Sequence, residues 1–435
     1  MVYRRIVRFQ LYDTEMVGPL GLYGIAQGID ELDAPVLFVG HVLGRDGTVK
    51  NHVCMCRAGH NAQVVDVGHR REFLDLTLQK RLQLVRVGVT GHDGVKVDRR
   101  DQPVLHKTDT TKLSTAECYG IALCELGEEH KDVVALTADL AKSTKIGMFG
   151  EKFPDRFFNV GIAEQNLFGV AAGMAKNGLI PFASTFAIFA SARSLDQIHT
   201  DICYQNVPVK IIATHAGTSF GQAGSTHHSL IDMACMRVLP NMTVICPCDG
   251  SETYHAVKAA YDIPGPVYIR INRGFDQVIY KSPADCNFEW DKATVMNEGT
   301  DITVIACGSC VFEAMQAARM AEADAGLKVR VINMHTIKPI DEEAVMSAIM
   351  DTRRIITVED HEVMGGLGSA VAEVVAKSGK ACAFKMLGHQ NAFSTIGLQE
   401  DLLAIAGIDA NGISAAIQEL MHADFEADDA WDDEF

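Results

Sequence analysis

Beyond residue 107, short apolar runs alternate along the chain with longer amphipathic stretches. The short runs predict buried strands, and the apolar spacing of the longer stretches predicts helices between them. The predicted strands are "DVVALTADL", "LIPFAST", "VPVKIIATHAG", "MTVICPCD" and "PVYIRINR", and the predicted helices are "AEQNLFGVAAGMAKNG", "FAIFASARSLDQIHTDICYQN" and "SETYHAVKAAYD". Strands that alternate with helices form parallel sheets with crossover helices, so the pattern predicts an α/β domain over residues 108–280.

A second α/β unit is predicted over residues 300–421, where runs such as "DITVIACGS" and "RIITVEDH" alternate with helical stretches such as "CVFEAMQAARMAEADAG". A polar, less periodic segment at residues 281–299 is predicted to be a linker between the two units. Residues 422–435 read "HADFEADDAWDDEF", an acidic tail that is expected to be solvated. We therefore expect two consecutive parallel-sheet α/β domains.

The first 107 residues have a different pattern and predict a small β-rich or mixed domain. Asp46 and Gly47 form a turn signal between two alternating apolar runs, which predicts a hairpin. A cluster follows with metal-ligating residue types: His52, Cys54, Cys56 and His60. Its spacing differs from that of the usual structural zinc sites, and alternating residues on one strand face explain the two cysteines equally well, so the metal reading stays open.

Composition narrows the class of protein. The chain has 435 residues, of which 48% are hydrophobic, and a formal net charge of −17. This charge argues against a nucleic-acid partner. The twelve cysteines show no disulfide framework, the first residues lack the apolar core of a secretory signal, and no apolar run is long enough to span a bilayer. We therefore expect a soluble, cytoplasmic protein with reduced thiols.

Several candidate functional residues follow predicted strands. Asp139 and Ser143 come just after "VVALT", His215 ends the strand in "ATHAG", and His227 lies in a glycine-rich loop. Open α/β sheets bind ligands at the carboxyl ends of parallel strands. Each residue alone also has a structural explanation, because Asp139 can cap the next segment and the histidines can be satisfied polar groups on loops.

Two further signals lie at predicted helix starts. Glu164, in "RFFNVGIAEQNLFGVAAGMAKNG", begins an apolar helix, where an acid also stabilises the positive end of the helix dipole. Phe186 and Phe189 are three residues apart, so they are expected on one face of a helix, where aromatic residues usually belong to the core.

From about Lys112 to Leu420, roughly 70% of the chain, the sequence resembles the transketolase family, in particular the shorter subunit of the two-gene enzymes. The resemblance rests on "FFNVGIAEQN", "ATHAG", "MRVLPNMTVICPCD", "NMHTIKPID" and "GGLGSAVAEV" taken together. It implies a pyrimidine-binding domain and a C-terminal domain. The implied activity is transfer of a two-carbon ketol unit between sugars, with sugar phosphates of the pentose phosphate type as expected substrates and thiamine diphosphate as cofactor.

The resemblance also implies roles for single residues. Glu164 would hydrogen-bond the pyrimidine nitrogen N1′ as a protonated acid, and burial favours the protonated form of a carboxyl group. Histidine suits proton transfer because its ordinary pKa lies near working pH. The remaining implied roles are cofactor contacts by Phe186, Phe189, Asp139 and Leu140, contacts to sugar hydroxyls and protons by His215 and His227, and substrate-phosphate contacts by Ser143 and Arg273.

The diphosphate-binding element of the family is not found in this sequence. The resemblance therefore implies a separate N-terminal subunit that holds the diphosphate and Mg²⁺, and a heterotetramer of the two chains. This chain itself is expected to bind no metal in the site.

Two positions depart from the family pattern. Ala116 falls where counting places a phosphate-binding arginine, and Ala223 falls where an aspartate usually reads a sugar hydroxyl. Losing a bidentate arginine weakens the case for an ordinary pentose phosphate. The alternatives are a 1-deoxyxylulose 5-phosphate synthase-like enzyme, an enzyme like the beta chain of a 2-oxoacid dehydrogenase, and a non-catalytic paralogue.

Overall fold

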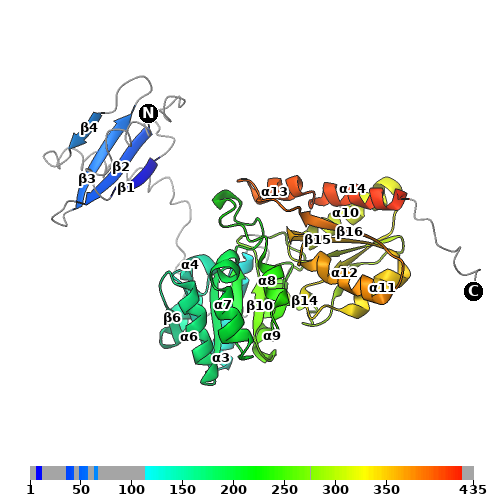
Figure 1. Cartoon of the computed structure of the whole chain (residues 1–435), viewed down its shortest axis with the longest axis horizontal. Helices are drawn as coiled ribbons and strands as arrows, with labels where there is room; N and C mark the ends of the chain where they lie inside the picture. The colour runs from blue at the N-terminus through cyan, green and yellow to red at the C-terminus, as the bar shows by residue number, and fades with distance from the viewer. Residues whose placement is uncertain are drawn as a thin grey trace, which may run out of the picture. The chain divides into compact units, whose positions relative to one another are not determined.

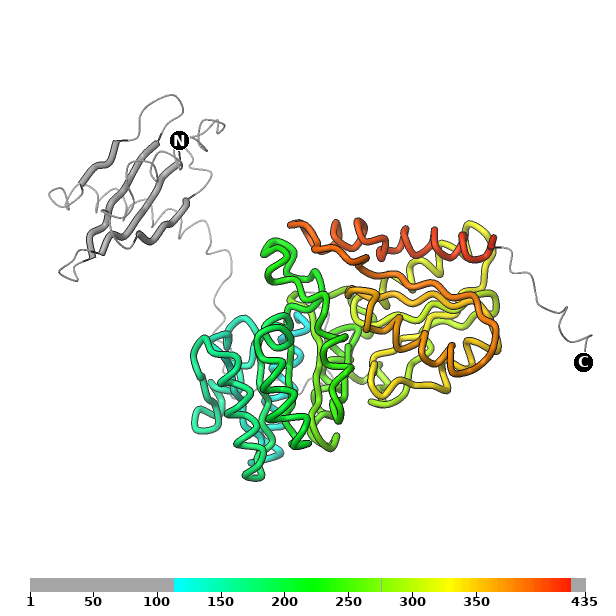
Figure 2. The backbone as a smooth tube through the Cα atoms, in the orientation of Figure 1, coloured from blue at the N-terminus to red at the C-terminus, as the bar shows by residue number. Residues whose placement is uncertain are grey.

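The computed structural model describes residues 113–274 and 276–423, together with four strands nearer the N-terminus. The chain divides into two compact units, Met1–Asp101 and Gln102–Phe435. Figure 1 draws the described elements of each unit, and Figure 2 traces the backbone.

The first unit contains a four-stranded sheet in the order β1-β2-β3-β4. Its strands are β1 (Ile6–Leu11), β2 (Val36–Leu43), β3 (Val49–Cys56) and β4 (Gln63–Asp66). Strands β2 and β3 pair antiparallel from Val36↔Cys56 to Leu43↔Val49, which confirms the predicted hairpin. Of the proposed metal ligands, His60 lies outside the described residues, as do the side chains of His52, Cys54 and Cys56.

The second unit begins with a seven-stranded sheet in the order β14-β9-β10-β8-β7-β5-β6, parallel except for β14. Its strands are β5 (Val133–Thr137), β6 (Phe157–Asn159), β7 (Ile180–Phe186), β8 (Lys210–Thr214), β9 (Thr243–Ile245), β10 (Val267–Arg270) and β14 (Thr336–Lys338). The accompanying α-helices are α3 (Thr115–Glu129), α4 (Ala141–Thr144), α5 (Gly147–Lys152), α6 (Glu164–Lys176), α7 (Leu195–Gln197), α8 (Asp232–Val238) and α9 (Gly250–Asp262). Short 3₁₀ turns lie at Pro154–Arg156, Gly221–Ala223 and Pro283–Asp285, and π-helical turns lie at Phe189–Arg193 and Ile198–Cys203.

Helices cover both faces of this sheet, which explains why its strands read as continuous apolar runs. In β5, Val133 and Ala135 pack with α3 and α9 on one face, whereas Val134 and Leu136 pack with α6 on the other. The two-residue period of the strand thus supplies both hydrophobic cores. Helix α3 begins where Ser114 and Glu117 form a reciprocal capping box.

The second domain of this unit holds a five-stranded sheet in the order β11-β13-β12-β15-β16. Its strands are β11 (Thr294–Asn297), β12 (Ile302–Ala306), β13 (Val329–Asn333), β15 (Arg354–Glu362) and β16 (Ala383–His389), and its helices are α10 (Cys310–Ala325), α11 (Glu342–Asp351), α12 (Leu367–Ser378), α13 (Gln399–Ala406) and α14 (Ala410–His422). Helices α10 and α14 cover one face, and α11 and α12 cover the other (Figure 1). Only β11 runs antiparallel to its neighbour; it comes from the segment 281–299 that the sequence suggests as a linker.

The two α/β domains of this unit share structure. Strand β14 follows β13 in the chain, yet it pairs antiparallel with β9 and completes the first sheet. The predicted single strand "LKVRVINMHTIKPI" is therefore wrong, because its two halves belong to different sheets. One hydrophobic core also runs from α6 and α8 through β14 to α11 and α12, so the domains pack as one body.

Two broader expectations can be set beside the described residues. No helix among them is long and apolar enough to cross a membrane. Their ten cysteines are all free thiols. The expected α/β fold class, with two consecutive sheet domains, is confirmed.

Candidate active site

The candidate site lies at the carboxyl ends of three neighbouring strands, β5, β7 and β8. Asp139 follows β5, Phe186 ends β7, and His215 follows β8. Asp139 and His215 both have φ near +60°, a left-handed conformation that is uncommon for residues other than glycine. Such backbone conformations concentrate at functional sites, where the surrounding structure holds them in place.

Five rings form a contiguous cluster at this edge. Phe186 stacks on His215 with ring centroids 3.9 Å apart and on Phe189 at 5.4 Å. Phe220 packs edge-on against Phe186, His215 and His227, and His227 also packs edge-on against Phe189. The cluster offers an aromatic wall with imidazole nitrogens beside it.

The two phenylalanines reach this wall from different elements. Phe186 is the last residue of β7, whereas Phe189 begins a π-helical turn. The expectation that both lie on one helical face is therefore wrong. The strand extends one residue further than the apolar pattern indicates, and the chain reverses between the two rings.

Glu164 is the first residue of α6 and is only 5% exposed. The Arg193 guanidinium donates a hydrogen bond to Glu164 Oε1 at 3.1 Å. Arg193 also lies over the Phe189 ring, 3.8 Å from its centroid. The π-helical turn that begins at Phe189 ends at Arg193, so one irregular turn brings a cation to both the acid and the aromatic wall.

The group around Asp139 is held differently. Asn159, at the end of β6, accepts a hydrogen bond from the Asp139 backbone N–H at 2.9 Å and donates one to its carboxylate at 3.1 Å. Leu140 is half-buried, and its N–H donates to Thr137. Ser143 is exposed on the short helix α4. These residues share the edge of the sheet with the ring cluster, but no described contact joins them to it.

The two candidate histidines differ in environment. Burial, with smaller contributions from Arg273 and His227, lowers the pKa of His215 to about 3. Its Nδ1 lies 2.9 Å from the Thr214 hydroxyl. His215 is therefore neutral near pH 7, and the expectation that it changes charge at working pH is wrong. His227 is half-buried, with Nδ1 3.0 Å from the Thr226 hydroxyl.

Arg273 supplies a positive charge at the open side of the cluster. It is exposed, its guanidinium lies 4.9 Å from the Phe220 ring centroid, and its backbone N–H donates to Ser219. An arginine held over an aromatic ring keeps its outer donors available to an anion.

The loop that carries both histidines is braced by the second domain. Asp360, at the end of β15, accepts hydrogen bonds from the N–H and hydroxyl of Thr218, and His389 lies 3.0 Å from the same carboxylate. The Ser225 hydroxyl donates to the carbonyl of Ser394 on the far side of the loop. The second domain therefore takes part in shaping the site, beyond its packing role.

Both α/β domains match known families. "Transketolase, pyrimidine binding domain" matches residues 111–275, and "Transketolase, C-terminal domain" matches residues 291–413. A "Putative transketolase C-terminal section" of Methanocaldococcus jannaschii is 41% identical over 70% of this chain and 95% of its own length. The chain belongs to the transketolase family.

Further relatives in the transketolase family carry more specific names. One of the two subunits of an apulose-4-phosphate transketolase, from Phocaeicola vulgatus, is 38% identical over 69% of this chain and 95% of its own length. A solved structure described as "Split gene transketolase, inactive beta4 tetramer" is 44% identical, with a TM-score of 0.64 over 71% of this chain and 98% of that chain. These relatives identify a transketolase C-terminal subunit, whose family uses thiamine diphosphate and whose split form implies a separate N-terminal subunit.

The two departures from the transketolase pattern have different surroundings. Ala116 is fully buried in the core beneath α3, so its side chain does not face the site. The assignment of a missing phosphate-binding arginine to this position is therefore wrong, since counting along the chain cannot find a position ahead of a newly started helix. Ala223 is half-buried in the turn Gly221–Ala223, between the ring cluster and the second domain.

Three residues of the site were missed by the sequence interpretation: Asn159, Arg193 and Phe220. Asn159 and Phe220 lie inside the motifs "FFNVGIAEQN" and "ATHAGTSFGQAG", at a strand end and between the two histidines. Their positions were available signals. Arg193 gave no such signal, because its approach to Glu164 depends on a π-helical turn.

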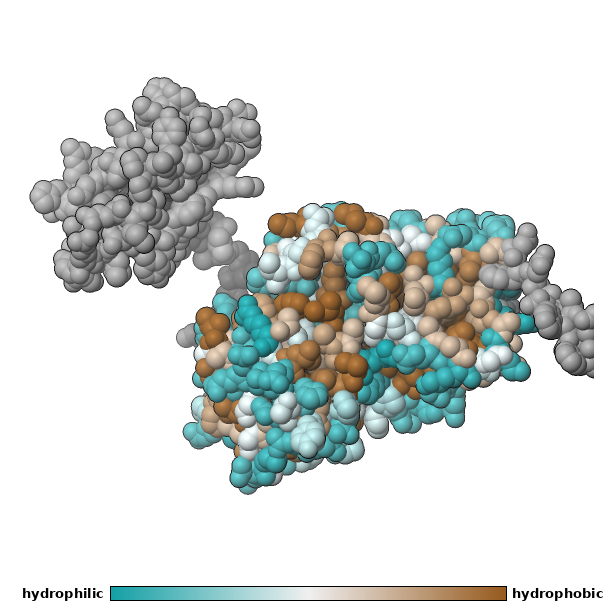
Figure 3. Space-filling view, viewed as in Figure 1, coloured by the Kyte–Doolittle hydropathy of each residue, from teal (hydrophilic) through white to brown (hydrophobic). Residues whose placement is uncertain are grey.

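Exposed apolar side chains flank the site. Ile162, two residues before Glu164, is 79% exposed, and Phe158 of β6 is 37% exposed. Figure 3 shows apolar surface at several places on the visible face of both α/β domains. Within the described ranges 113–274 and 276–423, no group of three or more His, Cys, Asp or Glu side chains could hold a metal ion.

Proposed function

We propose that this chain transfers a two-carbon ketol unit between sugars, as the C-terminal subunit of a split transketolase that uses thiamine diphosphate. The observation that carries the proposal is the pairing of a buried acid, Glu164, with a wall of aromatic rings at the carboxyl edge of a parallel sheet. A flat, polar heteroaromatic ring fits this arrangement, because the rings can stack on its face while the acid meets a ring nitrogen.

The residues present fit the pyrimidine half of the cofactor. Phe186 and Phe189 would pack against the ring, and Glu164 would hold a proton at its nitrogen. Asp139, oriented by Asn159, and Leu140 would face the thiazolium side. When bound, the cofactor supplies the electron sink that ketol cleavage requires.

Proton handling falls to the imidazoles. Neutral His215 can donate or accept a hydrogen bond at a sugar hydroxyl without carrying charge into the site. His227, less buried, is the residue we assign to proton transfer with the substrate. Arg273 and Ser143 would bind the anionic end of the sugar.

The partner in this proposal is a transketolase N-terminal subunit, which would hold the diphosphate and Mg²⁺ and form a heterotetramer with this chain. The exposed Ile162 beside Glu164 supports it, because an apolar side chain of this size next to a polar site favours a covering surface. A cytoplasmic location and sugar phosphate substrates belong to the same proposal.

Reconstitution tests the proposal. This chain, an N-terminal subunit from the same organism, and the two mixed are assayed for ketol transfer with thiamine diphosphate and Mg²⁺. The donors are xylulose 5-phosphate, apulose 4-phosphate, 6-deoxy-6-sulfofructose and their uncharged analogues, the second and third taken from relatives' names. Pyruvate with glyceraldehyde 3-phosphate tests the synthase alternative, since a "1-deoxy-D-xylulose-5-phosphate synthase 1" of Geobacter sulfurreducens is 37% identical over 73% of this chain.

We expect turnover only in the mixture, and weak cofactor binding by this chain alone in calorimetry. Submicromolar binding of thiamine diphosphate without a partner would contradict the half-site arrangement. A mixture that assembles but processes none of these substrates would favour the non-catalytic paralogue.

A further inference from the structure

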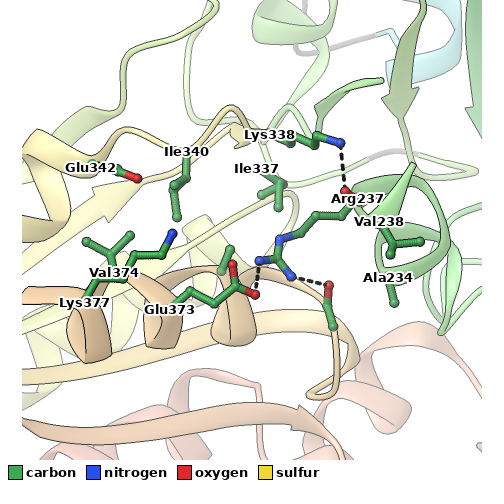
Figure 4. A pocket seen from close by; sticks show the side chains of 12 residues that line it. Ala234, Arg237, Val238, Ile337, Lys338, Ile340, Glu342, Glu373, Val374 and Lys377 are labelled. Carbon is green, nitrogen blue, oxygen red and sulfur yellow. Dashed lines mark hydrogen bonds and ion pairs between the residues drawn. The ribbon is translucent and has the colours of Figure 1, made fainter. Parts of the chain in front are cut away.

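A cavity of about 580 Å³ lies away from the candidate active site, between α8, β14 and α12. Figure 4 shows the side chains that line it. Arg237 enters from the last turn of α8, Lys338 from the end of β14, and Lys377 from the last turn of α12. Ile340 and Val374 contribute apolar wall between these cations.

The cations are held in place rather than neutralised as a group. Arg237 pairs with Glu373 at 2.5 Å and donates to the carbonyl of Gly365 (Figure 4). The Lys338 ammonium donates to the carbonyls of Arg237 and Leu239, at the end of α8. The cavity therefore carries three basic and two acidic side chains, the second acid being Glu342, in a chain of net charge −17. Its local excess of positive charge runs against the charge of the whole protein.

Further basic residues lead from this cavity to the end of α14. Lys380 lies in the turn between α12 and β16, and Arg353 lies beside it, since the Arg353 carbonyl accepts the N–H of Ala383 at the start of β16. Lys385, also near the start of β16, pairs with Glu419 in the last turn of α14. The end of α14 and the lysine end of the cavity thus meet the same edge of the five-stranded sheet, around its edge strand β16.

We propose that the acidic segment Asp424–Phe435 folds back around the β16 edge and binds in this cavity. The segment contains seven acidic and no basic residues, and its aromatic residues are Phe425, Trp431 and Phe435. Its acids complement the path of Arg353, Lys380 and Lys377, and an aromatic ring fits the apolar wall beside them.

The length of the segment permits this path. Twelve extended residues span up to about 40 Å, whereas a helix the length of α12, twelve residues, is about 18 Å long. The path rounds one sheet edge and follows part of α12. The binding energy would be largely electrostatic at an exposed surface, so it must weaken with salt.

Trp431 provides a direct readout in the full chain. The sequence has two tryptophans, so Trp290→Phe leaves Trp431 as the sole fluorescent indole. In this background, acrylamide quenching is measured at about 0.05 M and about 1 M NaCl, where the screening length shrinks from roughly 14 Å to 3 Å. Lys377→Glu and Lys380→Glu are the test variants; both lysines are exposed. Lys131→Glu is the matched control, an exposed lysine at the start of β5.

We expect quenching at low salt to be about threefold weaker than at high salt, because the bound indole is shielded until the salt screens its attraction. Each test variant should lose most of this protection while keeping its melting temperature, and Lys131→Glu should keep it. Equal quenching at both salt concentrations would overturn the proposal. Protection that grows with protein concentration would also overturn it, since the segment would then bind a neighbouring copy. The result is independent of the proposed enzymatic function.

Discussion

Replacing Glu164 by glutamine separates a catalytic role from a structural one. The substitution keeps the shape of the side chain and removes its charge and acidic proton. The Glu164 side chain is 6% exposed, but its partner Arg193 is 51% exposed, so solvent screens the ion pair. The amide oxygen of glutamine can still accept the Arg193 hydrogen bond. We therefore expect the free energy of unfolding to fall by no more than about 1 kcal/mol, or about 3 °C in melting temperature.

The expected loss of activity is much larger. If Glu164 holds the proton at the cofactor ring, an amide cannot replace it, and acid–base assistance of this kind contributes about 10²- to 10⁴-fold in rate. That range corresponds to roughly 3 to 5 kcal/mol of activation free energy. The effect on turnover therefore exceeds the effect on stability several times over, which makes the two readings distinguishable.

Glu117→Gln is the matched control. Glu117 also lies in the first turn of a helix and pairs with a lysine, Lys145, at 3.1 Å. It belongs to the α3 capping box instead of the site, so its variant should lose comparable stability and keep its activity. The assay is ketol transfer by the reconstituted pair, normalised to folded protein, beside thermal melts. A Glu164→Gln variant that melts many degrees early yet keeps its turnover per folded molecule would refute the reasoning.

Three further predictions concern stability and the site loop. Gly366→Val should damage folding and assembly before chemistry, because even a Cβ there would lie 2.0 Å from Glu359 Oε2; size-exclusion profiles and melts check this. Glu252 and Glu359 are fully buried, and burial raises the pKa of each to about 7. Each is worth up to about 3 kcal/mol of stability that is present below pH 4.5 and lost as pH rises to 7, so Glu252→Gln should flatten the pH dependence of denaturant unfolding over that window. Ala116→Arg should destabilise the protein by several kcal/mol, because it buries a cation without a partner, whereas Ala223→Asp should fold normally in the same melts.

Much of the fold was accessible from the pattern of apolar residues. Strands such as β5 and β8 are buried on both faces, so their runs are continuous and bounded by turn residues, and the helices between them show the helical period. The family resemblance then pointed to Glu164 and His215 before any contact was known, and the structure brings the histidine to the aromatic wall beside the acid. Their chemical roles stay predictions.

Other features depend on contacts between distant segments. Local pattern alone could not send β14 to the first sheet, because its apolar residues satisfy either core equally well. It also could not show that Phe186 ends a strand, that Ala116 faces the core, or that burial holds His215 neutral.

The sequence by itself determined the α/β class, the order of the domains and the residue types of a transketolase site, since these follow from local periodicity and short motifs. Tertiary structure decided which sheet takes β14, how Arg193 meets Glu164 and how Asp360 braces the histidine loop. The physical reason is that hydrogen bonds and pKa values depend on distance and burial in space, and residues far apart in the chain set both.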